Sequence, residues 1–154
     1  MKARIDMESR SVRIRKLAPN AVTPTYGSPS AAGADLYALA DSPIRFAPGE
    51  TILVRTGIAM EIPEGCAGFV FARSGMASKR GLAPANKVGV IDSDYRGEIL
   101  VALHNHSREE QTVEPGERVA QIVIAPVLRA EFTLCDSLSE TERASGGFGS
   151  TGRN

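Results

Sequence analysis

The stretch EILVALH, residues 98–104, decides the expected fold class. Ile99, Val101 and Leu103 recur at every second position, and that period places large apolar side chains on one face of an extended strand. Strand character returns at IAMEI (58–62), GFVFA (68–72) and ERVAQIVIAPV (117–127). The 15 glycines and 9 prolines cut the chain into short pieces bounded by turns. Many short strands at close spacing predict an all-β fold, a sandwich, jelly roll or barrel.

The length of the chain, 154 residues with 42% apolar content, suffices for one core and is too small for two. The glycine-rich end from Ser137 offers only Leu138 and Phe148 as large apolar residues, too few to order a segment by burial. We therefore expect one β domain over residues 1–136 and a mobile arm over 137–154. Residues 73–86 are expected to hold one or two helical turns, with Ser74 as the cap.

The charge balance excludes several classes of partner. Lys plus Arg and Asp plus Glu both number 18, so no global field draws the protein to a nucleic acid polymer or an anionic membrane. The N-terminus lacks an apolar targeting segment, and no stretch approaches the ~20 apolar residues of a membrane span. We expect a cytoplasmic protein. Cys66 and Cys135 lack the spacing of a metal or redox motif and are expected to be packed thiols.

The stretch GVIDSDYRGE (89–98) concentrates chemistry in a few residues. If NKVGVIDSDYRGEIL (86–100) forms a hairpin, Asp92 lies at its tip and could take a proton from a water, as a general base must. Tyr95 would then give a flat wall against a sugar ring. The alternative is a structural turn in which Asp92 and Asp94 make Asx hydrogen bonds.

Two further stretches could hold anions. In ARSGMAS (72–78), Arg73, the Ser74 hydroxyl and the amides after Gly75 would form an anion site at a helix start. In the arm, glycine amides, Arg143 and the Ser150 hydroxyl could hold phosphate while Phe148 stacks on a base. The alternatives are an ordinary capped surface turn for the first and a flexible linker for the second.

Metal chemistry has two candidate sites in the sequence. His104 and His106 share one face of an extended strand, which allows a metal pair, but no third ligand stands nearby and a solvated strand explains them as well. Their role stays open. Asp35, in SAAGADLYA, could face a magnesium ion or simply end a strand.

Five stretches together resemble, in order and spacing, the five motifs of the homotrimeric dUTPase family. They are AAGADLYA (31–38), ARSGMAS (72–78), GVIDSDYRGE (89–98), GERVAQIVI (116–124) and RASGGFGSTG (143–152). The resemblance covers about residues 12–152, and the third and fifth motifs are the most specific. It implies a jelly-roll fold, a homotrimer with active sites shared between subunits, and Mg²⁺-dependent hydrolysis of dUTP to dUMP and pyrophosphate. That activity would supply dUMP for thymidylate synthesis and keep uracil out of DNA.

The resemblance also implies roles for single residues. Asp92 is similar to the general base for the water that attacks the α-phosphorus, and Gln121 to the glutamine beside that water. Tyr95 is similar to the wall that excludes a 2'-hydroxyl. The implied uracil pocket consists of Asn86, Val90, Ile91 and Leu100.

The implied phosphate turn consists of Arg73, Ser74 and Gly75. The arm residues Arg143, Phe148, Gly149 and Ser150 would close over uracil and the γ-phosphate, from a different subunit than the Asp92 hairpin. Mg²⁺ would be held mainly by the triphosphate, with Asp35 acting through a water at most.

Two other functions share this outline. A dCTP deaminase has the same fold but needs an acid–base group at cytosine C4, and the sequence IDSDY followed by an aromatic, glycine-rich arm favours the phosphohydrolase. A non-catalytic nucleotide sensor is the second alternative, against which Asp92, Gln121 and the arm argue. The motif departures, Ala72 and Met76 in the second motif, leave the phosphate donors intact.

Overall fold

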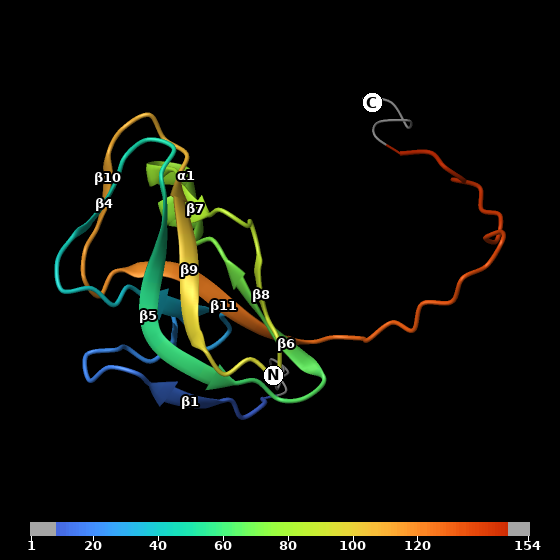
Figure 1. Cartoon of the computed structure of the whole chain (residues 1–154), viewed down its shortest axis with the longest axis horizontal. Helices are drawn as coiled ribbons and strands as arrows, with labels where there is room; N and C mark the ends of the chain where they lie inside the picture. The colour runs from blue at the N-terminus through green and yellow to red at the C-terminus, as the bar shows by residue number, and fades with distance from the viewer. Residues whose placement is uncertain (1–8, 148–154) are drawn as a thin grey trace, which may run out of the picture.

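The structure, a computed structural model, describes residues 9–147 and contains two main β-sheets packed face to face (Figure 1). One sheet has the order β1-β5-β9-β7 and the other the order β2-β3-β11-β6-β8, with β10 and β4 as a separate pair. The first sheet comprises Arg13–Lys16, Thr51–Glu61, Glu98–Asn105 and Leu82–Pro84. The second comprises Thr25–Tyr26, Ala34–Tyr37, Arg118–Pro126, Cys66–Phe71 and Gly89–Ile91; β10 is Gln111–Val113 and β4 is Ile44–Phe46. The predicted all-β class is confirmed.

The core lies between the two sheets. The alternation predicted for residues 98–104 is confirmed, since Ile99, Val101 and Leu103 of β9 are at most 1% exposed while Leu100 is 41% exposed. Ile58, Met60 and Ile62 are also buried as expected. Phe69 and Phe71 share one face, with ring centroids 6.4 Å apart, but this is the outer face, and Phe71 is 36% exposed.

The predicted hairpin over residues 86–100 is wrong. Strand β8 pairs with β6 in one sheet, whereas β9 pairs with β5 and β7 in the other. Residues 92–97, hereafter the Asp92 loop, therefore cross from one sheet to the other. The sequence pattern of two short strands joined by a six-residue turn is the same for a hairpin and for a connection between two sheets. The alternation of apolar residues does not specify which strands pair.

The helix predicted within residues 73–86 is confirmed, but the prediction that Ser74 caps it is wrong. Helix α1 spans Ser74–Arg80, and Arg73 occupies the N-cap position without a side-chain cap hydrogen bond. Ser74 is thus the first helical residue. The helix ends at Gly81, which has φ of +68° and whose N–H donates to the Ala77 and Met76 carbonyls, as left-handed C-terminal glycines do.

The C-terminal segment that follows β11 extends away from the two sheets (Figure 1). The last strand finishes at Pro126, and beyond it Leu128, Phe132 and Leu134 are 95–100% exposed. Cys66 is buried as expected, but Cys135 on this segment is exposed, so its prediction as a packed thiol is wrong for the single chain. The domain boundary at residue 136 stays a prediction. No helix in residues 9–147 is long and apolar enough to cross a membrane.

Candidate active site

A polar pocket of about 530 Å³ lies where β3, β11 and the start of α1 meet; we call it the Arg73 pocket. It brings together the predicted phosphate turn, Gln121 and Asp35, which come from three separate stretches of sequence. The pocket is also lined by positively charged side chains that the sequence analysis did not single out, Lys79, Arg80 and Arg118. Its lining includes Asp35, Arg73, Ser74, Gly75, Lys79, Arg80, Arg118 and Gln121.

Asp35 is held between two arginines. Its carboxylate accepts hydrogen bonds from Arg73 Nε at 2.7 Å and from Arg118 Nη1 at 3.3 Å, and its side chain is only 13% exposed. The two guanidinium groups compensate the cost of burying this carboxylate. Because Nε of Arg73 faces Asp35, the terminal nitrogens of that planar group stay available as donors.

Gln121 is fixed beside Asp35. The two residues are direct partners in the β11–β3 ladder, and Gln121 Nε2 donates to the Ala72 carbonyl at 2.9 Å. Gly33 makes room for the amide, since a Cβ there would lie 2.4 Å from Gln121 Oε1. Sequence reasoning missed Gly33 and Arg118; the signal available was their position inside the first and fourth motifs.

The Asp92 loop is organised by its own backbone and by Arg96. The Tyr95 N–H donates to the Asp92 carbonyl at 3.1 Å, and Arg96 Nη1 donates to the Ser93 and Tyr95 carbonyls. The Asp92 side chain is exposed, and no hydrogen bond or ion pair to its carboxylate occurs within residues 9–147. The Asx-turn alternative for Asp92 and Asp94 is therefore not observed, and the Asp92 carboxylate is free to bind a water.

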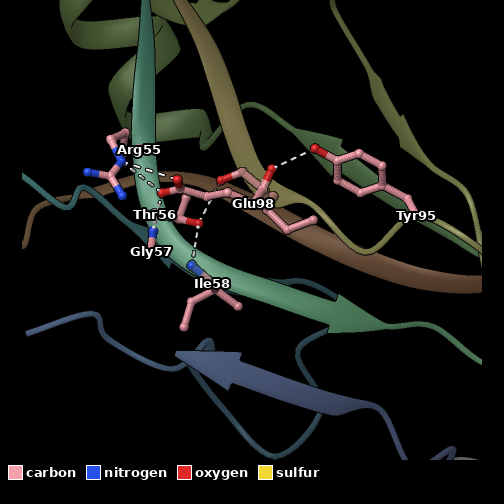
Figure 2. A network of polar contacts seen from close by, with 7 residues as sticks. Arg55, Thr56, Gly57, Ile58, Tyr95 and Glu98 are labelled. Atoms are coloured by element: carbon pink, nitrogen blue, oxygen red, sulfur yellow. Dashed lines mark hydrogen bonds and ion pairs between the residues drawn. The ribbon is translucent and has the colours of Figure 1, made fainter. Parts of the chain in front are cut away.

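Tyr95 lies across the following residues (Figure 2). Its hydroxyl donates to the Glu98 carbonyl at 3.0 Å, and a Cβ on Gly97 would lie 2.4 Å from that hydroxyl oxygen. Tyr95 is 43% exposed, so the side chain is accessible to a ligand.

The residues predicted to surround uracil sit on either side of this loop. Val90 and Ile91 belong to β8, and Leu100 to β9. Asn86 follows β7, and a Cβ on Gly89 would lie 3.4 Å from its amide nitrogen. Val90 is 59% and Leu100 41% exposed, which is unusual for strand residues of this size and leaves an apolar surface beside the loop.

The Asp92 loop and the Arg73 pocket lie toward opposite ends of β6. Ile91 pairs with Gly68 near the start of β6, whereas Arg73 lies two residues beyond its last residue, Phe71. Five to six residues at about 3.3 Å each separate the two regions by roughly 15 to 20 Å. This separation is several times longer than a hydrogen bond, the reach within which a general base must find its water.

The C-terminal segment starts next to the Asp92 loop. The Val127 N–H donates to the Gly65 carbonyl at 2.9 Å, and an open pocket of about 1180 Å³ is lined by Val127, Leu128, Asp92 and Arg96 among others. Farther along, Arg143 Nε donates to the Gly146 carbonyl at 2.8 Å. Phe148, Gly149 and Ser150 lie outside the described residues.

His104 and His106 lie together as predicted, with ring centroids 4.3 Å apart. Burial, the neighbouring His104 and the Lys87 charge lower the pKa of His106. His104 Nδ1 shares a hydrogen bond with the Thr51 hydroxyl. In the part of the chain that the structure describes, no group of three His, Cys, Asp or Glu side chains could hold a metal ion.

Comparison with known proteins gives one consistent result. The family model for dUTPase matches residues 19–152. The deoxyuridine 5'-triphosphate nucleotidohydrolase of Desulfitobacterium hafniense (strain DSM 10664 / DCB-2) is 56% identical over 130 residues, 84% of this chain and 86% of that protein. The enzyme of that name from Serratia proteamaculans (strain 568) is 44% identical, with both chains fully covered.

Solved structures agree on the fold. A Staphylococcus bacteriophage 80alpha dUTPase with dUPNHPP superposes with a TM-score of 0.86 at 26% identity, covering 94% of this chain and all of that one.

Proposed function

This chain belongs to the dUTPase family and is a dUTP diphosphatase, and from that premise we propose how it acts. Asp92 of one copy of the chain activates the water that attacks the α-phosphorus of dUTP, while the phosphates lie in the Arg73 pocket of another copy. The observation that carries this proposal is the separation of these two regions by roughly 15 to 20 Å along β6. Each region holds half of the required chemistry, so a complete site needs two chains.

The proposed reaction is a hydrolysis in which atoms and charges balance. The Asp92 carboxylate accepts a proton from the water, whose oxygen forms a bond to the α-phosphorus. The bond from that phosphorus to the bridging oxygen breaks, and pyrophosphate leaves with its electrons. Asp92 is suited to this role because its carboxylate is exposed and has no hydrogen-bond partner in residues 9–147.

The Arg73 pocket supplies donors and positive charge. Arg73, the Ser74 hydroxyl and the Gly75 amide would hold phosphate oxygens, and Gln121 would orient the attacking water. A charge-assisted donor set of this kind stabilises the charge that develops during phosphoryl transfer.

Magnesium fits this site as an ion carried by the substrate. The pocket offers one carboxylate beside Gln121 that could approach a metal, Asp35, and two arginines already pair with it. Mg²⁺ takes few protein ligands and keeps several waters, so the residues present are consistent with an ion held by the triphosphate and touching Asp35 through water. When bound, it would neutralise phosphate charge.

Base and sugar recognition are assigned to the region around the Asp92 loop. Asn86, Val90, Ile91 and Leu100 would surround uracil, and Tyr95 would lie under the deoxyribose. Residues 137–154 form the proposed arm, in which Arg143, Phe148, Gly149 and Ser150 close over uracil and the γ-phosphate. The proposed cellular role is to supply dUMP for thymidylate synthesis and to keep uracil out of DNA, in the cytoplasm.

The proposed assembly is a homotrimer, in which cyclic symmetry gives each copy the same contacts. The extended segment after Pro126 supports contact between copies. Leu128, Phe132 and Leu134 are almost fully exposed in the single chain and lie within seven residues of one another. Such a surface is normally covered by a partner.

The test is product analysis after incubation of the purified protein with dUTP, dCTP and dTTP, each with and without Mg²⁺. The proposal expects dUMP and pyrophosphate from dUTP alone, and only with Mg²⁺. Ammonia released from dCTP would instead identify a deaminase. Binding of dUTP without turnover would identify a nucleotide sensor.

A further inference from the structure

The position of the Tyr95 ring depends on the backbone of residues 97 and 98. Its hydroxyl donates to the Glu98 carbonyl at 3.0 Å, and the ring passes so close to Gly97 that a Cβ there would lie 2.4 Å from the hydroxyl oxygen. The ring is 43% exposed, so core packing does not immobilise it. Whatever fixes Glu98 therefore fixes Tyr95.

Glu98 lies opposite an irregularity in β5. Arg55 pairs with Leu100 and Ala59 with Glu98, so residues 56–58 of β5 face Ile99 alone. Extra residues of this kind leave backbone groups without a partner in the ladder. The Thr56 hydroxyl bridges part of the gap, donating to the Ile99 carbonyl at 2.6 Å and accepting from the Ile58 N–H at 3.3 Å.

The Glu98 carboxylate bridges the rest of the gap (Figure 2). It accepts from the Gly57 N–H at 2.7 Å and from Arg55 Nε at 3.1 and 3.2 Å. The Glu98 side chain is only 17% exposed, so these charge-assisted bonds are partly shielded from water.

Gly57 is a rigid anchor for that carboxylate. It has φ of +69° and would place a Cβ 2.7 Å from both Ala21 Cβ and Leu39 Cδ2. Its carbonyl accepts from the Leu17 N–H at 2.8 Å. The backbone that Glu98 holds is thus fixed from the side of β1 and the loop after it.

We infer that Glu98 is a positioning residue for Tyr95, and that its bonds to Gly57 and Arg55 contribute to the choice of deoxyribose over ribose. The inference rests on the proposed role of Tyr95 under the sugar. Glu98 ends the third motif but has no role assigned to it above, and Arg55 and Gly57 lie outside the five motifs. A ring held in place can exclude a 2'-hydroxyl by contact, whereas a ring free to tilt away cannot.

The test compares kcat/KM for UTP with that for dUTP in Glu98→Ala and Glu98→Gln. In Glu98→Ala the UTP-to-dUTP ratio should rise by a factor of about three to ten, the worth of one net hydrogen bond. Glu98→Gln keeps an oxygen acceptor for the Gly57 N–H and should restore the ratio toward that of the wild type. Glu110→Ala is the matched control, because it breaks another Glu–Arg pair, with Arg45 at 3.2 Å, and should leave the ratio unchanged.

Tyr95→Phe keeps the inference testable if Glu98→Ala does not fold. It removes only the hydroxyl of a half-exposed ring and should also raise the ratio. A second readout needs no substrate: in Glu98→Ala, amide exchange at Gly57 should accelerate and the Tyr95 ring signals in NMR spectra should show greater mobility.

Any of three kinetic results would overturn the inference: an unchanged ratio in folded Glu98→Ala, an unchanged ratio in Tyr95→Phe, or an equal rise in Glu110→Ala. Unaltered Tyr95 ring signals in Glu98→Ala would also overturn it. If the wild-type protein does not hydrolyse dUTP, the proposed function fails, and the ring signals still decide whether Glu98 positions Tyr95.

Discussion

The Arg73 pocket and the Asp92 loop are built in opposite ways. In the pocket the charged groups are tied to each other, with Asp35 held by Arg73 and Arg118 and only 13% exposed. In the loop, the backbone and Tyr95 are tied down, whereas the Asp92 carboxylate is exposed and has no hydrogen-bond partner in residues 9–147.

This difference matches what each region has to do. A pocket that holds a polyanion benefits from cations whose positions are fixed before the substrate arrives. A general base needs a carboxylate that can accept a proton and whose position is set by its backbone. Because the two regions lie roughly 15 to 20 Å apart in one chain, the contrast also predicts that variants at either end impair the same reaction in different ways.

The largest effect is expected for Asp92→Asn. The amide cannot act as a base, so kcat should fall by at least ~10²-fold while dUTP binding and the fold are retained. Steady-state kinetics and dUTP titration measure both. Asp94→Asn is the matched control, two residues along the same loop, and should keep kcat near that of the wild type. Near-normal kcat in Asp92→Asn would place the base elsewhere.

Arg73→Ala should act mainly on binding. Loss of charge-assisted bonds to phosphate is expected to raise KM for dUTP by about 10- to 100-fold, with a smaller loss in kcat. Arg45→Ala, which breaks an exposed ion pair with Glu110, should leave KM unchanged. If Arg73→Ala alters kcat alone, the pocket does not bind the ground-state phosphates.

Tyr95→Ala should change selectivity more than rate. Without the ring, space opens for a 2'-hydroxyl, and the ratio of kcat/KM for UTP to that for dUTP should rise about tenfold. Competition assays with both nucleotides measure this ratio. Undiminished exclusion of UTP would show that another group contacts the ribose.

The smallest effect concerns the pH dependence of stability at Glu61, which forms an ion pair with Arg96 of the Asp92 loop at 3.8 Å. The hydrogen bond from Arg13, with the charges of Arg13 and Arg96, lowers the pKa of Glu61 below 4.5. Such a group stabilises the folded state above its unfolded pKa, and this contribution is lost as the pH falls through the folded pKa. Thermal unfolding of Glu61→Gln should therefore depend less on pH below about 4.5. The same decrease in unfolding temperature with falling pH in the variant and the wild type would contradict this.

The strands could be predicted from the sequence because their burial follows local alternation, as in Ile99, Val101 and Leu103. Their partners could not. Residues 89–91 and 98–105 belong to different sheets, and nothing in their pattern distinguishes this from a hairpin. The outward direction of Phe71 and the exposure of Cys135 also depend on long-range packing rather than on residue type.

Most candidate site residues were predictable because they occur within the five motifs, and Asn86 and Leu100 flank the third. The structure confirms that Asp35, Arg73 and Gln121 lie together, although they are far apart in the sequence. Arg118 and Glu98 were missed because their roles arise from contacts, with Asp35 in one case and with an irregular strand in the other. Both residues lie inside motifs, Arg118 in the fourth and Glu98 at the end of the third, but the motif alone does not show which contacts they make.

The most direct test of a site shared between chains is complementation. Asp92→Asn and Arg73→Ala proteins are unfolded together in equal amounts, refolded, and assayed at low dUTP concentration. A site is intact only if its loop comes from an Arg73→Ala chain and its pocket from an Asp92→Asn chain, each with probability one half. Random assembly of a cyclic trimer should therefore restore about a quarter of wild-type kcat/KM. A mixture that forms mixed oligomers but stays at the mean of its two parents would contradict the shared site.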